Sequence, residues 1–170
     1  MIDLFKTAVV GQFHAALSML KSTVDQCPED QWGCRVGEFP LWQVAYHALF
    51  YADLYLSPDE ASYEPFTRCW QHYQFFGRLP WPPYEEVKAE VPVPRGDVLA
   101  YIEHCRQKAI EMVAAETAES LAGPPGFWWY KIPRAEFHLN NIRHIQHHAA
   151  QMSLALRRAA GVDVQWVATG

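Results

Sequence analysis

Apolar residues recur every three to four positions along several stretches of the chain, which is the spacing of one face of a helix. The first stretch covers residues 2–26, and the second begins around Pro40 and stops at Ser57-Pro58. The second stretch is apolar nearly all round, so we expect it to be the most buried helix. In the first stretch the apolar stripe contains Phe5, Val9, Phe13, Ala16, Leu20 and Val24.

Two further helices are expected in the second half of the chain. Asp97 is a suitable N-cap for one of them, and the other follows Pro133 and continues to about Ala160, before a Gly161 of the type that commonly ends helices. The third helix has one apolar face, made by Val98, Ile102, Cys105, Ala109 and Val113. Four long helices with little strand pattern predict an all-α protein, a four-helix bundle.

The connection between the second and third helices is unusually long. Residues 57–96 hold seven of the twelve prolines, which predicts an ordered connection with one short helix from Tyr84 to Ala89. A connection of this length has room to cross over, so the helices need not alternate up and down. Aromatic residues at 63–84 and in GFWWYKIP at 126–133 either pack as a minor core or cover the bundle end, where they would select an apolar or aromatic substrate.

Composition narrows the class of protein. The chain has 170 residues, half of them hydrophobic and 19% charged, which is typical of a single folded domain over residues 1–170 and excludes a disordered chain. The formal net charge is -5 and the basic residues are scattered, so no nucleic-acid partner is expected. No apolar run is long enough to span a membrane and the N-terminus does not resemble a secretory signal, so we expect a cytoplasmic protein with no membrane partner.

The four cysteines do not predict a metal site or a disulfide. Cys27, Cys34, Cys69 and Cys105 form neither a CxxC pair nor a zinc-ribbon spacing. A reducing compartment would leave them as thiols, so we expect them to be buried or incidental.

The segment NIRHIQHHAAQM, residues 141–152, carries the strongest chemical pattern of the chain. Each helical residue advances by about 100°, so His144 and His148 lie about 40° apart on one face, one turn removed from each other. His147 and His138 turn away from this face, and we expect both to lie toward solvent. The face itself is expected to point into the bundle, and it also holds Phe137, Asn141, Gln151 and Ala155.

His47 is the expected third member of the cluster. Between Trp42 and Ala52 the only strongly polar side chains are Gln43 and His47, which share a face. Burying an imidazole in so apolar a helix costs free energy unless a hydrogen bond or a metal satisfies its nitrogen. The two remaining histidines of the other helices, His14 and His104, fall far from the apolar centres and are expected to be solvated.

Two interpretations of His47, His144 and His148 are open. The rings could form a neutral hydrogen-bonded network, or one divalent ion could satisfy three ring lone pairs at once. We favour the metal, because clustered imidazoles would compete for few acceptors. In either case the polar residues available to bond the rings and fix their tautomers are Gln12, Gln43, Asn141 and Gln151.

The stretches LWQVAYHALFYADLYL and NIRHIQHHAAQMSLALRRAAG, with CPEDQW after the first helix and the tail VDVQWV, resemble the DinB-like superfamily of bacterial four-helix bundles. The resemblance covers nearly the whole chain. It implies helices in up-down-down-up order and a divalent metal held by one histidine of the second helix and an HxxxH pair of the fourth, here His47, His144 and His148. The family usually has a glycine where this chain has Ala150, which leaves open how closely another backbone approaches there.

Three neutral imidazoles would leave an ion its full charge and an open coordination position, as in catalytic zinc sites. Such an ion acts as a Lewis acid toward water and holds a thiol as its thiolate. Nitrogen ligands suit zinc or nickel, and also iron or cobalt. Ile145 follows His144, so the HExxH motif of metalloproteases is absent. No Ser-His-Asp set is evident, and the sequence assigns no catalytic residue.

Members of the superfamily include enzymes that use low-molecular-weight thiols, such as bacillithiol or mycothiol, as cofactor or co-substrate. The resemblance therefore implies a metal-dependent thiol S-transferase or hydrolase that acts on a small electrophilic substrate. The alternative is a non-catalytic or stress-related module in which the ion is structural. A homodimer is compatible with the sequence, although no pattern predicts one.

Overall fold

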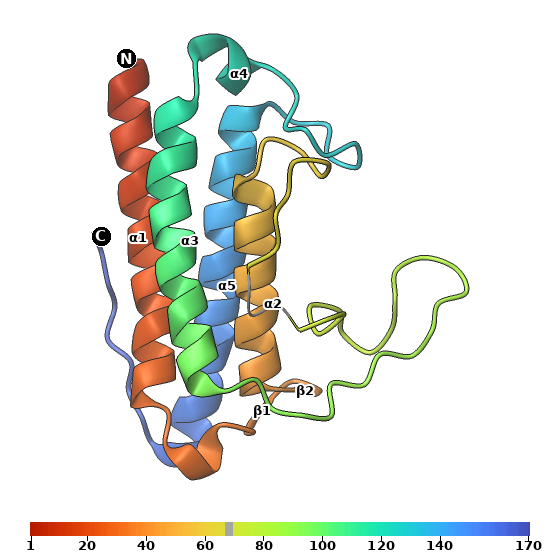
Figure 1. Cartoon of the computed structure of the whole chain (residues 1–170). Helices are drawn as coiled ribbons and strands as arrows, with labels where there is room; N and C mark the ends of the chain where they lie inside the picture. Colours follow the sequence, from red (N-terminus) through yellow and green to blue (C-terminus); the bar gives the residue numbers. More distant parts are fainter. Residues whose placement is uncertain (67–69) are drawn as a thin grey trace.

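Four long helices form a bundle in the computed structural model, which describes residues 1–66 and 70–170. They are α1 (Ile2–Gln26), α2 (Leu41–Leu56), α3 (Arg95–Ala115) and α5 (Arg134–Ala160). The helices α1 and α2 each pack against both α3 and α5. In Figure 1, α1 and α5 run downward, whereas α2 and α3 run upward. The all-α architecture is therefore confirmed.

Short elements connect the long helices. A 3-10 helix, η1 (Glu29–Gln31), follows α1, and a pair of antiparallel strands, β1 (Arg35–Val36) and β2 (Phe39–Pro40), leads into α2. The short helix α4 (Ala118–Ala122) follows α3, and Thr117 and Ser120 form a capping box at its start. These elements were not predicted, because each is too short to show a periodic pattern.

The predicted apolar faces make the core of the bundle. The predicted stripe of α1 is buried apart from Phe5, which is half-buried, and the predicted face of α3 is buried along its whole length. Nearly every residue of α2 is buried, as its uniformly apolar sequence predicts. Packing of the helices is thus driven by the faces that the periodicity identifies.

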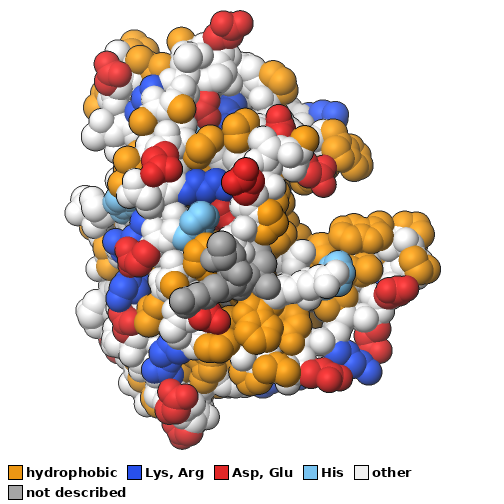
Figure 2. Space-filling view, in the orientation of Figure 1, with side chains coloured by type: hydrophobic (Ala, Val, Ile, Leu, Met, Phe, Trp, Pro, Cys, Tyr) orange, Lys and Arg blue, Asp and Glu red, His pale blue; other side chains and the backbone are white. Residues whose placement is uncertain are grey.

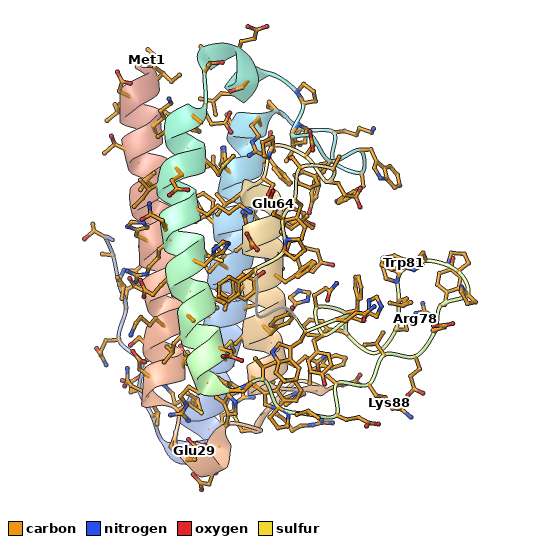
Figure 3. All side chains as sticks on the ribbon, viewed as in Figure 1. Met1, Glu29, Glu64, Arg78, Trp81 and Lys88 are labelled. Carbon is orange, nitrogen blue, oxygen red and sulfur yellow. The ribbon has the colours of Figure 1, made fainter. Side chains whose placement is uncertain are left out.

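Residues 84–89 do not form the predicted helix. They belong to a backbone hairpin in which the amide of Leu79 donates to the carbonyl of Glu85 at 2.9 Å. Tyr84 has a φ of 60°, which is incompatible with a right-handed helix at that residue. The hairpin projects from the bundle and carries Trp81 away from the helices (Figures 1 and 3). Figure 2 shows hydrophobic side chains gathered along this projection.

The helix α3 begins at Arg95, before the predicted cap Asp97. The carbonyl of Pro94 accepts hydrogen bonds from the amides of Asp97 and Val98. Pro94 is therefore the N-cap, and Asp97 lies in the first turn, where the helix dipole stabilises a carboxylate.

The connection after α2 is ordered where it packs along that helix. We call residues 70–76 the docked segment. The Nε2 atom of Gln43 in α2 donates to the carbonyls of Tyr73, at 3.3 Å, and Phe75, at 3.2 Å. The prediction of an ordered connection is confirmed for this segment.

The loop at 126–133 builds part of a second, smaller core. This core consists of Leu54, Tyr55, Phe127 and Phe137. The minor-core interpretation therefore holds for Phe127, whereas Trp128 is exposed. Gly126 has a φ of 87°, and a Cβ there would lie 1.8 Å from the carbonyl oxygen of Pro58. Only glycine fits this close approach.

The cysteines that the structure describes are free thiols. Cys27 and Cys105 are buried, as predicted, and Cys34 is half-buried. Cys69 lies outside the described residues. Within the described ranges, no helix is both long enough and apolar enough to cross a membrane.

Candidate metal centre

The three predicted histidines meet at the seam between α2 and α5. His47 lies in the second turn of α2, and His144 and His148 lie one turn apart in α5. The Nε2 atom of His144 is 3.3 Å from Nε2 of His47 and 3.1 Å from Nε2 of His148. One ring nitrogen from each residue lies within 4.8 Å of the other two. The three side chains are therefore positioned to hold a metal ion.

Two of the three nitrogen separations suit a tetrahedral ion. Zinc–nitrogen bonds of about 2.0–2.1 Å at tetrahedral angles place neighbouring ligand nitrogens about 3.3 Å apart. The two Nε2–Nε2 distances lie close to this value. His148 is buried, whereas His47 and His144 are half-buried, so one side of the cluster is open. A fourth coordination position on that side can be reached by water or by a small molecule.

Hydrogen bonds behind two of the rings direct their lone pairs toward the shared centre. The Nδ1–H of His47 donates to the carbonyl oxygen of Gln74 at 2.6 Å, and the Nδ1–H of His148 donates to Oε1 of Gln151 at 3.0 Å. In each neutral ring Nε2 is then the unprotonated nitrogen. Outer hydrogen bonds of this kind orient metal-ligating histidines.

The three converging Nε2 lone pairs lack enough hydrogen-bond donors, and a cation would satisfy them. A proton on Nε2 of His144 could bond to one neighbouring ring, but the other ring would keep an unpaired lone pair. The Nδ1 atom of His144 is buried and has no hydrogen-bond partner within residues 1–66 and 70–170. This Nδ1 is unpaired with or without an ion, but a purely hydrogen-bonded network also leaves one Nε2 lone pair unsatisfied, whereas one divalent ion accepts all three Nε2 lone pairs.

Burial keeps the three rings in the neutral form. It lowers the pKa of His47 to about 4, that of His144 to about 3 and that of His148 to about 4. The hydrogen bond to Gln74 offsets part of this effect at His47, and the neighbouring histidines add to it at His144. Metal ligation requires the unprotonated imidazole, so at neutral pH the rings are ready to bind an ion.

Aromatic rings fix the orientation of the cluster. Phe76 of the docked segment stacks on His47, with ring centroids 4.1 Å apart. Tyr51 packs edge-on against His47 and His144, at centroid distances of 4.9 and 5.6 Å. These contacts restrict rotation of the two half-buried rings, so the site is largely formed before an ion binds.

The family of the protein follows from its sequence as a whole. A family model described as the DinB superfamily matches residues 12–152, which include His47, His144 and His148. The chain belongs to the DinB superfamily. Searches among curated proteins and among solved structures gave no match. The resemblance seen in the sequence is thus confirmed, and in this DinB superfamily protein the matched region contains every residue of the triad.

The groups that hydrogen-bond the three histidine rings of this DinB superfamily protein differ from the four residues that the sequence predicts for this role. Gln151 bonds His148, as expected, although the residue is exposed. Gln43 holds the docked segment instead of a ligand ring, and Nδ2 of Asn141 donates to the carbonyl of Ala52 at 3.1 Å. Gln12 is exposed and forms no hydrogen bond among the described residues.

The partner of His47 was missed by sequence reasoning. It is the backbone carbonyl of Gln74, which reaches the ring across a sequence separation of 27 residues. Every residue has a carbonyl, so no side-chain pattern marks this one. The position of the docked segment had to be known first.

The histidine face of α5 lies at the seam with α2, and its predicted inward direction is only partly right, since Phe137, Asn141 and His148 are buried and the rest of the face is not. The centre is occupied by Ile145, Ala149 and Met152, which are fully buried, whereas Gln151 is exposed and Ala155 is half-buried. The reason is that α5 packs against both α1 and α2. Its apolar stripe serves the core, and the adjacent histidine stripe lies at the α2 seam.

His138 is buried, contrary to the prediction that it faces solvent. Its Nε2 atom lies 2.9 Å from Oε1 of Glu116, and Nε of Arg134 lies 2.8 Å from the same oxygen. Glu116 is the C-cap of α3, so the helical wheel of α5 alone could not reveal this partner. His147 is exposed, as predicted.

His104 is also wrongly predicted, because it is anchored to a buried carboxylate. Its Nε2 atom lies 3.1 Å from Oδ1 of Asp53, and Nζ of Lys108 lies 2.6 Å from the same oxygen. The side chain of Asp53 is 0% exposed, although the residue lies in the apolar helix α2. An acid in so apolar a segment was the signal that sequence reasoning overlooked. His14 is half-buried, 3.4 Å from the carbonyl of Arg106.

Proposed function

We propose that this DinB superfamily protein binds one divalent metal ion through the Nε2 atoms of His47, His144 and His148. The observation that carries the proposal is the convergence of these atoms at 3.1 and 3.3 Å while the Nδ1 atoms of His47 and His148 are engaged elsewhere. Zinc or nickel suits the all-nitrogen ligand set best, and iron or cobalt is compatible with it.

The open side of the triad supports a catalytic use of the ion in a metal-dependent thiol S-transferase or hydrolase. A bound ion with three neutral ligands supplies a Lewis acid that activates a thiol or a water. The chain contributes the seam between α2 and α5, the stacked Phe76 and the edge-on Tyr51 that hold the rings, and a pocket beside the triad for a small electrophilic substrate.

The helix directions support the remaining part of the expected architecture. The downward course of α1 and α5 and the upward course of α2 and α3 correspond to the up-down-down-up order of the family (Figure 1). The long connection after α2 allows α2 and α3 to run in the same direction.

A structural role for the ion is the second candidate. The bond between His47 and Gln74 links the triad to the docked segment, so an ion that fixes His47 would also hold this part of the connection in place. Under this alternative the ion raises stability but no substrate is turned over.

The metal content of protein purified without a histidine tag tests the proposal. We expect about one equivalent of a divalent metal per chain in the wild type, and a decrease of about tenfold or more in His148→Ala. His147→Ala is the matched control, because it removes an exposed imidazole one residue away on the same helix. Equal metal content in His148→Ala and wild type would contradict the proposal. Circular dichroism establishes that both variants are folded.

Turnover separates the two roles of the ion. Metal-loaded wild type is assayed with low-molecular-weight bacterial thiols and model electrophiles, and with ester and amide substrates. A rate that is lost in His148→Ala but kept in Arg158→Gln, at an exposed residue of the same helix that lines a different cavity, supports the enzyme. A melting temperature that falls on chelation, without any turnover across the panel, supports the structural role.

A further inference from the structure

A pocket of about 710 Å³ opens beside the triad, and His47 and His144 form part of its lining. Three tyrosines make its aromatic wall: Tyr51, Tyr55 and Tyr130. The outward face of α5 supplies the polar side, where Arg143 and His147 lie one turn apart. The other lining residues are two with carboxamide side chains and an alanine. A molecule bound here would contact the open side of the triad.

The charge of this pocket is opposite in sign to that of the whole protein. The chain carries 19 acidic and 14 basic residues, yet no aspartate or glutamate lines the pocket and Arg143 is its one fully charged side chain among the described residues. Burial raises the pKa of Tyr51 and of Tyr55, so neither phenol adds a negative charge. The lining therefore favours a negatively charged ligand.

Arg143 is available to such a ligand. It is exposed, and within residues 1–66 and 70–170 it forms no ion pair and no hydrogen bond. No acid lies one turn away from it along α5, where its neighbours are Leu139, Asn140, Gln146 and His147. A guanidinium without a partner beside an acid-free pocket has its full hydrogen-bonding capacity free, and its planar fork matches a carboxylate.

We infer that this pocket binds a small aromatic carboxylate, with the carboxylate on Arg143, the ring against Tyr51, Tyr55 and Tyr130, and the reacting group at the histidine triad. The inference rests on the proposed function, since the triad defines where the reacting group lies. A carboxylate suits the site better than a phosphate dianion, because Arg143 is the one fully charged side chain of the described lining and balances a single negative charge. The aromatic wall selects a flat, apolar body.

Two matched probes test the inference. 4-Mercaptobenzoate and 4-mercaptobenzamide share a ring and a thiol and differ in the charged group. Calorimetric titration of zinc-loaded wild type is expected to show binding of the benzoate about tenfold tighter than that of the benzamide. In Arg143→Gln the preference should disappear, and in Arg143→Lys part of it should remain. Arg158→Gln is the control, because Arg158 is exposed on the same helix but lines a different cavity, beside β1.

The outcomes distinguish failure of the inference from failure of the proposed function. A preference for the benzoate that survives in Arg143→Gln, or that is absent from metal-loaded wild type, overturns the inference. The metal content of each sample is measured in parallel. Wild-type protein without metal overturns the proposed function. If that metal-free sample still prefers the benzoate in a way that depends on Arg143, the inferred carboxylate site is supported. If the metal-free sample shows no such preference, the inferred carboxylate site is overturned.

Discussion

The carbonyl oxygen of Gln74 accepts a 2.6 Å hydrogen bond from Nδ1 of His47. The bond spans two elements that are far apart in the sequence, the helix α2 and the docked segment. Gln43, one turn before His47, donates to the carbonyls of the residues on either side of Gln74. Gln43 is therefore a positioning residue for the histidine triad, because it holds the loop whose carbonyl bonds His47.

Replacement of Gln43 should weaken metal binding without removing a ligand. Gln43→Leu loses both bonds to the docked segment, so the orientation of His47 is no longer fixed and metal affinity is expected to fall by about 10- to 100-fold. Competition with a chromophoric chelator measures this affinity. Gln12→Leu, at an exposed position, should retain wild-type affinity. Equal affinities in the two variants would show that Gln43 supports only the loop.

Removal of the buried charge of Asp53 should destabilise the bundle strongly. In the wild type the buried carboxylate of Asp53 is bonded by Lys108, His104 and Tyr101. Asp53→Asn removes the negative charge that neutralises Lys108. The free energy of unfolding in urea is expected to fall by about 3–5 kcal/mol. The exposed pair of Lys21 and Asp25 provides the comparison, since Asp25→Asn should cost less than about 1 kcal/mol. Similar losses for both variants would contradict this account.

Glu116 should make the free energy of unfolding decrease as the pH becomes acidic. Burial alone would raise the pKa of Glu116, but hydrogen bonds from His138, Ser120 and Arg134, together with the charge of Arg134, lower it to about 2. The unfolded chain binds the proton at a higher pH, so the contribution of Glu116 is complete above pH of about 4.5 and is lost as the pH falls toward about 2.

The variant Glu116→Gln isolates this contribution. Its free energy of unfolding should be lower than that of the wild type at neutral pH, and the difference should narrow as the pH falls from about 5 to about 3. Urea titrations across that range measure it. Glu119→Gln, an exposed substitution on α4, should follow the wild-type curve. A difference between wild type and Glu116→Gln that is constant with pH would disprove the linkage.

The same substitution should have opposite effects at two glycines. Gly126→Ala places a methyl group against the carbonyl of Pro58 at a positive φ, and we expect a loss of about 2 kcal/mol or more. Gly11 lies within α1, and a methyl group added there would meet no atom of another described element within 4 Å. Gly11→Ala should therefore stabilise the protein by about 0.5–1 kcal/mol. Melting temperatures that shift in the same direction would contradict the structural explanation.

The helices and the triad could be predicted because each leaves a local mark in the sequence. The apolar period of α1 and α3 reports one buried face, and the cores observed there match it. His47 stands out as a polar residue in an apolar helix, and the four-residue spacing of His144 and His148 places both on one side of α5. These features depend on neighbours within a single helix.

The remaining features depend on contacts between elements, which no helical wheel contains. His138 was assigned to solvent because its partner, Glu116, caps a different helix. Asp53 finds its partners on α3, and the carbonyl of Gln74 reaches the triad only through the docked segment. A hairpin around Trp81 stands where a helix was predicted, because Tyr84 adopts a left-handed backbone conformation. A tyrosine at this position does not predict that conformation.

The face of α5 that fills the core is separate from the face that carries His144 and His148. Ile145 and Met152 can therefore stay constant while exposed residues around the pocket, such as Arg143 and His147, are exchanged. A change of ligand preference at these positions then costs little of the packing on which folding depends. A lineage built on this arrangement can diversify its chemistry through a handful of outward positions without passing through unfolded ancestors.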